Sequence, residues 1–97
     1  MTPEQLRELM ELLRERVRME DASSRSVRFD RPSAEELVRE GVPDEGVRQL
    51  MDAPWYPEMI EDVEETPEFC SAAETPEAVL GYARDVITEY LRKRFAL

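Results

Sequence analysis

The feature that most constrains the fold is a long run of periodic apolar residues between positions 75 and 95. Thr75 can cap a helix there with its hydroxyl, and Pro76 suits the first helical position, where no backbone donor is needed. The apolar side chains recur at three- and four-residue steps, which gathers them on one helix face. The main stripe is Val79, Ala83, Val86 and Tyr90, with Leu80, Ile87 and Leu91 one position aside. A stripe this wide needs a partner surface, which the rest of the chain is expected to supply.

A second long helix is predicted at the other end, from Pro3 to about Met19. Thr2 and Gln5 form a capping box, and Pro3 again takes the first helical position. An apolar stripe follows at helical spacing: Leu6, Leu9, Met10, Leu13 and Val17, widened by Leu12.

Three short helices are expected between these two. Ser33 opens one over residues 34–40, which Gly41 would end in the left-handed conformation, and Asp44 caps the next over 45–52. The third covers 58–65, after a turn bracketed by Pro54 and Pro57. Phe69, Cys70, Ala72 and Ala73 add one apolar helical turn. The first two short helices have a helix-turn-helix outline, but acidic residues surround their exposed side chains, so direct nucleic-acid binding is not expected.

Residues 22–32 lack helical periodicity. Positions 26–30 alternate polar and apolar residues, as a strand does, but no second strand is evident for pairing. We therefore expect an extended linker held in place by Val27 and Phe29. The resulting prediction for residues 1–97 is one all-α domain: a small irregular helical bundle with two longer terminal helices and three short helices between them.

Charge is distributed unevenly along the 97 residues, whose formal net charge is −10. Residues 52–83 contain nine carboxylates and no Lys or Arg, whereas both flanking segments are mixed. Such a segment repels nucleic-acid phosphates and anionic membrane surfaces, and it attracts basic proteins.

The residue types that usually support catalysis are missing or isolated. The chain has no histidine, and its single cysteine, Cys70, has no basic neighbour to lower its pKa. The acidic helix face lacks the Glu-x-x-His and calcium-loop patterns, so it is interpreted as solvated surface rather than a metal site. We expect no enzyme activity, no metal and no cofactor. No apolar run approaches the length of a membrane span and no signal peptide is evident, so a cytoplasmic protein is expected.

Trp55 and Tyr56 are the sharpest candidates for a binding site, because prolines on both sides stiffen the backbone that presents them. Trp55 alternatively fills the core, and Tyr56 is expected to be the more exposed ring. The predicted partner-binding residues combine these rings with the carboxylates that follow: Trp55, Tyr56, Glu58, Glu61, Asp62 and Glu65.

Residues 67–78 and the following helix to Leu91 resemble the end of HicB-type antitoxins, in which a Pro-Gly-Cys turn and a Thr-x-Glu-Glu-Ala helix start lead into a long helix. The resemblance covers about a quarter of the chain. This sequence lacks the glycine of that turn, and helical sequence stands where the family has β-strands.

The function expected from the sequence is that of a small acidic interaction protein: an adaptor, accessory subunit or inhibitor of a basic protein partner. One alternative is an antitoxin or nucleic-acid mimic that neutralises a basic nuclease or DNA-binding protein. Another is an accessory subunit that completes an enzyme's shared site, with Arg84 or the carboxylates facing a second chain. Leu12 on the first helix and Tyr82 and Phe95 on the last lie beside the main apolar stripes, and this surplus predicts a homodimer built on the terminal helices.

Overall fold

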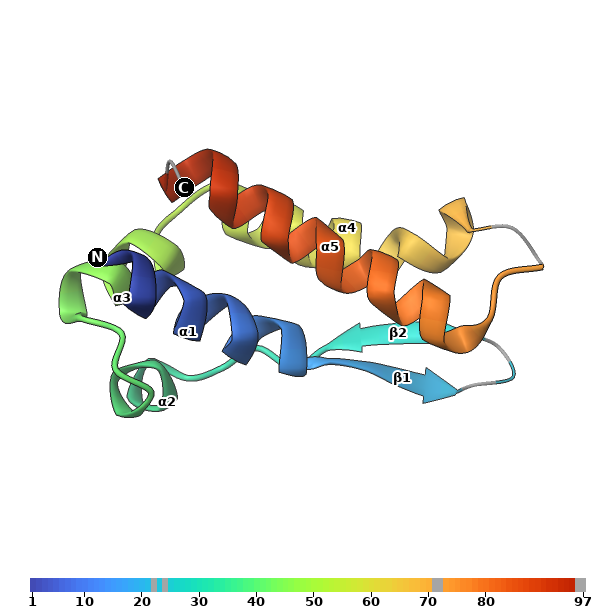
Figure 1. The fold of residues 1–97 in the computed structure, drawn as a ribbon, viewed down its shortest axis with the longest axis horizontal. Helices are drawn as coiled ribbons and strands as arrows, with labels where there is room; N and C mark the ends of the chain where they lie inside the picture. Colours follow the sequence, from blue (N-terminus) through green and yellow to red (C-terminus); the bar gives the residue numbers. More distant parts are fainter. Residues whose placement is uncertain (22, 24, 71–72, 96–97) are drawn as a thin grey trace.

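The computed structural model describes residues 1–97 except 22, 24, 71–72 and 96–97. These residues form five helices and one β-hairpin, arranged as in Figure 1. The elements in chain order are α1 (Pro3–Glu15), β1 (Val17–Asp21), β2 (Ser26–Phe29), α2 (Ala34–Arg39), α3 (Asp44–Met51), α4 (Trp55–Phe69) and α5 (Pro76–Phe95).

The all-α prediction is wrong, because the chain forms a two-stranded antiparallel sheet as well as helices. Helix α1 ends at Glu15, and the residues expected to extend it to Met19 form β1 instead. That strand is the pairing partner that residues 26–29 appeared to lack, so part of the expected linker is β2.

The hairpin has a defined register. Val17 lies opposite Phe29 and Met19 opposite Val27, and the register shifts between Met19 and Asp21, as in a β-bulge. Val17, Val27 and Phe29 are buried, so one face of the sheet packs on the core. Because successive side chains of a strand point to opposite faces, the apolar residues at alternate positions form the face that packs against the helices.

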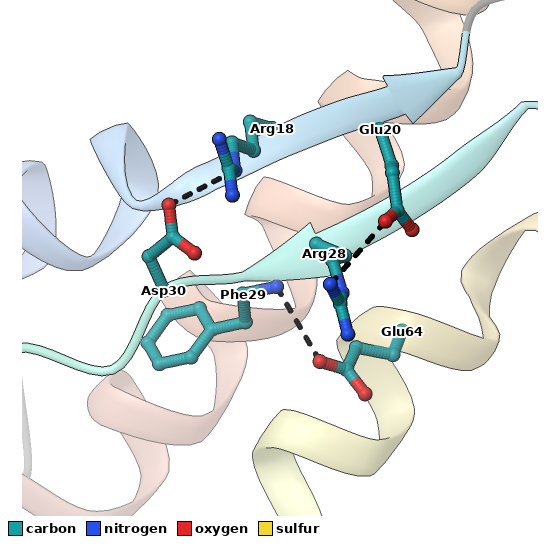
Figure 2. A network of polar contacts seen from close by, with 6 residues as sticks. All are labelled: Arg18, Glu20, Arg28, Phe29, Asp30 and Glu64. Carbon is teal, nitrogen blue, oxygen red and sulfur yellow. Dashed lines mark hydrogen bonds and ion pairs between the residues drawn. The ribbon is translucent and has the colours of Figure 1, made fainter.

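The outer face of the hairpin carries a polar network, shown in Figure 2. Arg18 pairs with Asp30 at 2.9 Å, and Arg28 pairs with Glu20 at 3.2 Å. On the far side of β2, the backbone N–H of Phe29 donates to a Glu64 side-chain oxygen of α4 at 3.4 Å. The side chain of Glu64 thus connects the outer edge of β2 to helix α4.

The helix ends follow the predicted capping signals at most positions. The Thr2–Gln5 capping box is present, and the hydroxyls of Ser33 and Thr75 each accept a backbone N–H. Gly41 has φ of 94° and ends α2 as predicted. The prediction that Asp44 caps α3 is wrong, since Pro43 occupies that position without a side-chain bond.

Helix α4 is longer than predicted at both ends. It starts at Trp55 rather than Glu58, because Pro57 falls in the first turn, where a missing N–H is tolerated. It continues through Pro67 to Phe69 instead of ending at Glu65. The aromatic pair is therefore part of a helix, not of a turn before it.

All seven elements contribute to a single apolar cluster. Helix α5 lies beside α4 and also contacts α1 and β1, while α4 covers β2 (Figure 1). The Nε of Arg84 on α5 donates to the carbonyl of Arg14 on α1 at 3.1 Å, which adds a polar contact to this packing. The fully buried residues of α5 are Val79, Ala83, Ile87 and Leu91. Over the described residues, no helix is long and apolar enough to cross a membrane.

Candidate partner-binding groove

A groove of about 640 Å³ lies between α4 and α5, and we refer to it as the α4/α5 groove. It includes the C-terminal half of α4 and the central part of α5, together with residues of the connection between them. The residues that line it are Asp62, Thr66, Phe69, Cys70, Glu74, Tyr82, Val86, Glu89 and Tyr90.

Two exposed aromatic side chains stand in this groove. Phe69 is 79% exposed and Tyr82 is 48% exposed. The other large apolar residues exposed in the described part of the chain, Met1 and Val38, lie outside the groove. The groove therefore contains apolar surface that remains exposed in the free chain, which is typical of sites that bind other molecules.

Carboxylates from three parts of the chain border this apolar surface. Asp62 comes from α4, Glu74 from the connection and Glu89 from α5. Residues 52–83, which form most of the groove, contain no Lys or Arg. The combination of exposed rings and negative charge makes the groove complementary to a surface that is both apolar and basic.

A hydrogen bond crosses the groove from α5 to α4. The Tyr90 hydroxyl donates to a carboxylate oxygen of Asp62. This bond raises the pKa of Tyr90 from 10.0 to about 12, with burial and the charges of Asp62 and Glu58 adding to it and Arg94 opposing it. Tyr90 therefore keeps its proton to higher pH than a free tyrosine, and its hydroxyl holds the Asp62 carboxylate in place.

An aromatic cluster supports Tyr90 from the side of the α4 N-terminus. Trp55 stacks on Tyr90 with ring centroids 6.2 Å apart, and its ring meets Phe95 edge-on at 6.2 Å. The guanidinium of Arg94 lies 5.9 Å from the Trp55 centroid and 5.7 Å from that of Tyr90. Trp55 is half-buried in this cluster, which positions a groove residue without lining the groove itself.

Tyr56 lies in the core, so the expectation that it is the more exposed ring is wrong. Its ring meets Phe29 of β2 edge-on at 6.4 Å, and the guanidinium of Arg31 lies 5.0 Å from its centroid. Its buried hydroxyl has no hydrogen-bond partner among the described residues. Burial raises the pKa of Tyr56 to about 12, although the charge of Arg31 and the approach of its guanidinium to the hydroxyl, which is too poorly aligned to count as a hydrogen bond, both lower it.

The predicted carboxylates all lie on α4, but they are not equivalent. Asp62 lines the groove, whereas Glu58, Glu61 and Glu65 are exposed on the helix surface outside it. No group of three or more His, Cys, Asp or Glu side chains that could hold a metal occurs in the described part of the chain.

Sequence reasoning did not place Phe69 or Glu89 in a site, and it assigned Tyr82 to the predicted homodimer contact rather than to a groove. Tyr82 lies off the apolar stripe of its helix, which indicated surface exposure but not that Phe69 would lie in the same groove. Phe69 and Cys70 were expected to belong to an apolar helical turn of their own, but Phe69 ends α4 and Cys70 is half-buried in the groove. Residue 72 of that expected turn lies outside the described residues.

No family model, curated protein or solved structure matches this chain. The resemblance of residues 67–91 to HicB-type antitoxins thus has no family match to support it. Helix α4 precedes this segment in the fold, and positions 71–72 within it are outside the described residues.

Proposed function

We propose that this chain is a non-enzymatic interaction protein that binds a basic protein partner through the α4/α5 groove and the acidic surface of α4 beside it. The observation that carries the proposal is the placement of two exposed aromatic rings, Phe69 and Tyr82, among carboxylates in one groove. A cytoplasmic location is part of the proposal, and the single free cysteine favours it because a disulfide framework is the usual sign of secretion.

The aromatic rings are the proposed source of affinity. A large aromatic side chain buries roughly 150–250 Å² when it is covered. At about 25 cal/mol per Å² of apolar surface, covering most of such a ring contributes a few kcal/mol. Phe69 has the most surface to lose, since it is 79% exposed in the free chain. A partner that covers both rings would gain enough to offset part of the entropy lost on association.

The carboxylates are the proposed source of selectivity and speed. Glu58, Glu61 and Glu65 are exposed, so their attraction to a basic partner acts mainly on the encounter rate and is screened by salt. Electrostatic steering of this kind raises association rates by about 10- to 1,000-fold. Asp62 is different because Tyr90 holds it within the groove, where it can pair with a cation on the bound segment.

A defined peptide probe tests this proposal directly. A peptide of Lys and Leu should slow the alkylation of Cys70 by N-ethylmaleimide, because Cys70 is the only cysteine and lines the groove. The matching peptide of Glu and Leu should leave the alkylation rate unchanged. Equal protection by both peptides, or protection by neither, would refute binding of a basic partner in this groove.

Charge reversal separates steering from general repulsion. Replacing Glu58, Glu61 and Glu65 by Lys should slow association of the Lys–Leu peptide and flatten its salt dependence. The matched control replaces three exposed carboxylates of α1 by Lys, because this changes the net charge equally on a helix that contributes no residue to the groove: Glu4, Glu8 and Glu11. If the two triple variants associate at the same rate, the acidic surface of α4 has no steering role.

A further inference from the structure

We infer that the segment bound in the α4/α5 groove is an amphipathic α-helix, with apolar residues facing Phe69, Tyr82 and Val86 and with Lys or Arg along its flanks. The inference rests on the proposed function and goes further by naming the conformation and side-chain pattern of the partner. It follows from the shape, the hydrogen bonding and the charge of the groove.

Two helices, α4 and α5, form the walls of the groove, and the residues that line it are three or four positions apart on each helix. Asp62, Thr66 and Phe69 are spaced by four and three residues on α4. Tyr82, Val86 and Tyr90 are spaced by four residues each on α5. Residues at such steps form ridges along a helix, and a groove between ridges is the surface into which another helix packs.

The hydrogen-bonding groups of the groove favour a helix over an extended segment. Among the described residues, none from β1 or β2 lines the groove, so an extended segment would find no strand edge with which to pair. The Thr66 hydroxyl donates to the carbonyl of Asp62 at 3.0 Å, and Tyr90 donates to the Asp62 carboxylate. A bound helix satisfies its own backbone groups and needs none from the walls, whereas a bound strand depends on them.

The length of the walls determines how much helix they can contact. At 1.5 Å per residue, the seven steps from Asp62 to Phe69 and the eight from Tyr82 to Tyr90 correspond to about 10 and 12 Å. This is about two helical turns. The bound helix should therefore present apolar residues at positions i, i+3 or i+4, and i+7.

The charge of the groove disfavours a symmetric dimer in which the grooves of two copies of this chain meet. Asp62, Glu74 and Glu89 border the apolar surface, and a symmetric contact through the groove would bring two such sets of carboxylates together. Like charges brought together on binding oppose association. Lys or Arg on the flanks of a different helix would instead pair with them.

Two peptides of identical Leu, Lys and Ala composition test the inference, one ordered with Leu at helical spacing and one with Leu at alternate positions. Each peptide is titrated into the full chain, and the backbone amide NMR signals of the chain are followed. The helical order should bind at least about tenfold more tightly, a difference large enough to be clear in a titration. It should shift signals of residues 62–69 and 82–90, and far-UV circular dichroism of the mixture should show gained helix.

Substitutions in the chain test whether the helical peptide binds in the α4/α5 groove. Phe69→Ala and Tyr82→Ala should each weaken binding of the helical peptide severalfold or more, because these rings are the exposed apolar contacts of the groove. Val38→Ala is the matched control, since Val38 is also exposed but lies on α2. Equal weakening by all three substitutions would overturn the location.

The outcomes separate this inference from the proposed function. If both peptide orders bind the groove equally well, the helical conformation is wrong while basic-partner binding stands. If neither peptide shifts the groove signals, both ideas fail. If replacing Lys by Glu in the helical peptide does not weaken binding, the basic character of the partner is wrong.

Discussion

Substitutions at two neighbouring residues, Val86 and Ile87, can test which face of α5 packs on the core. The sequence pattern places Val86 in the main apolar stripe and Ile87 beside it. In the structure Ile87 is fully buried, whereas Val86 is half-exposed and lines the groove. Ile87→Ala and Val86→Ala should consequently have very different effects on the free energy of unfolding.

The magnitudes follow from the environment of each side chain. Ile87→Ala removes three buried carbon groups and leaves a cavity, which costs about 2–5 kcal/mol. Val86→Ala removes two carbon groups that water already reaches in part, and the better helix propensity of Ala returns up to about 0.5 kcal/mol. The net change for Val86→Ala should thus remain below about 1 kcal/mol.

Urea and thermal denaturation followed by far-UV circular dichroism measure both changes. In a domain of this size 1 kcal/mol shifts the melting temperature by about 4–8 °C, so a loss of about 2–5 kcal/mol should make Ile87→Ala melt roughly 8–40 °C lower. If the two variants lose stability equally, or if Val86→Ala loses more, α5 packs on the core through a different face.

Two further predictions concern Tyr56 and the glycines. Tyr56→Phe removes a buried hydroxyl that makes no well-aligned hydrogen bond among the described residues, so it should raise the free energy of unfolding by about 1 kcal/mol in urea titrations. A loss of stability would show instead that the hydroxyl accepts a hydrogen bond from Arg31. Because burial raises the pKa of Tyr56 from 10.0 to about 12, the native chain keeps a proton that the unfolded chain releases, and stability should fall between pH 10 and pH 12, less steeply in Tyr56→Phe. Gly81→Ala should stabilise α5 by about 0.5–1 kcal/mol, since a Cβ there meets no atom within 4 Å, and thermal melts should show the opposite sign for Gly41→Ala, where φ is 94°.

Local signals explain why most helices could be predicted from the sequence. Thr2, Ser33 and Thr75 act through contacts within three residues, so each signal is complete in the sequence around it. Gly41 is equally local, because the left-handed conformation at a helix end needs only that residue.

The hairpin was missed because its evidence is divided between two segments. Val17 continues the four-residue spacing of α1, so β1 is hidden at the end of a helical pattern with no glycine or proline between them. Only pairing with residues 26–29 distinguishes a strand from a helix turn there, and pairing is a tertiary property.

The groove was missed for a related reason. Phe69 and Tyr82 come from different helices, and whether each is exposed depends on how α4 and α5 pack. The sequence identified Asp62 and the acidic segment around it, since charge can be counted without a fold. It could not distinguish a buried Tyr56 from an exposed one, because Pro57 fits either a turn or the first turn of a helix.

The hydrogen bond from the backbone N–H of Phe29 to the Glu64 side chain also bears on how the edge of β2 is protected from other chains. A two-stranded sheet has two open edges, and an open edge is a template on which another chain can add a strand and begin to aggregate. The Glu64 side chain occupies one donor on the β2 edge, and the irregular register after Met19 interrupts the β1 edge. Charged Arg18 and Glu20 further discourage pairing with a foreign strand. A hairpin this short can therefore remain two-stranded in a crowded cell without a third strand to cover it.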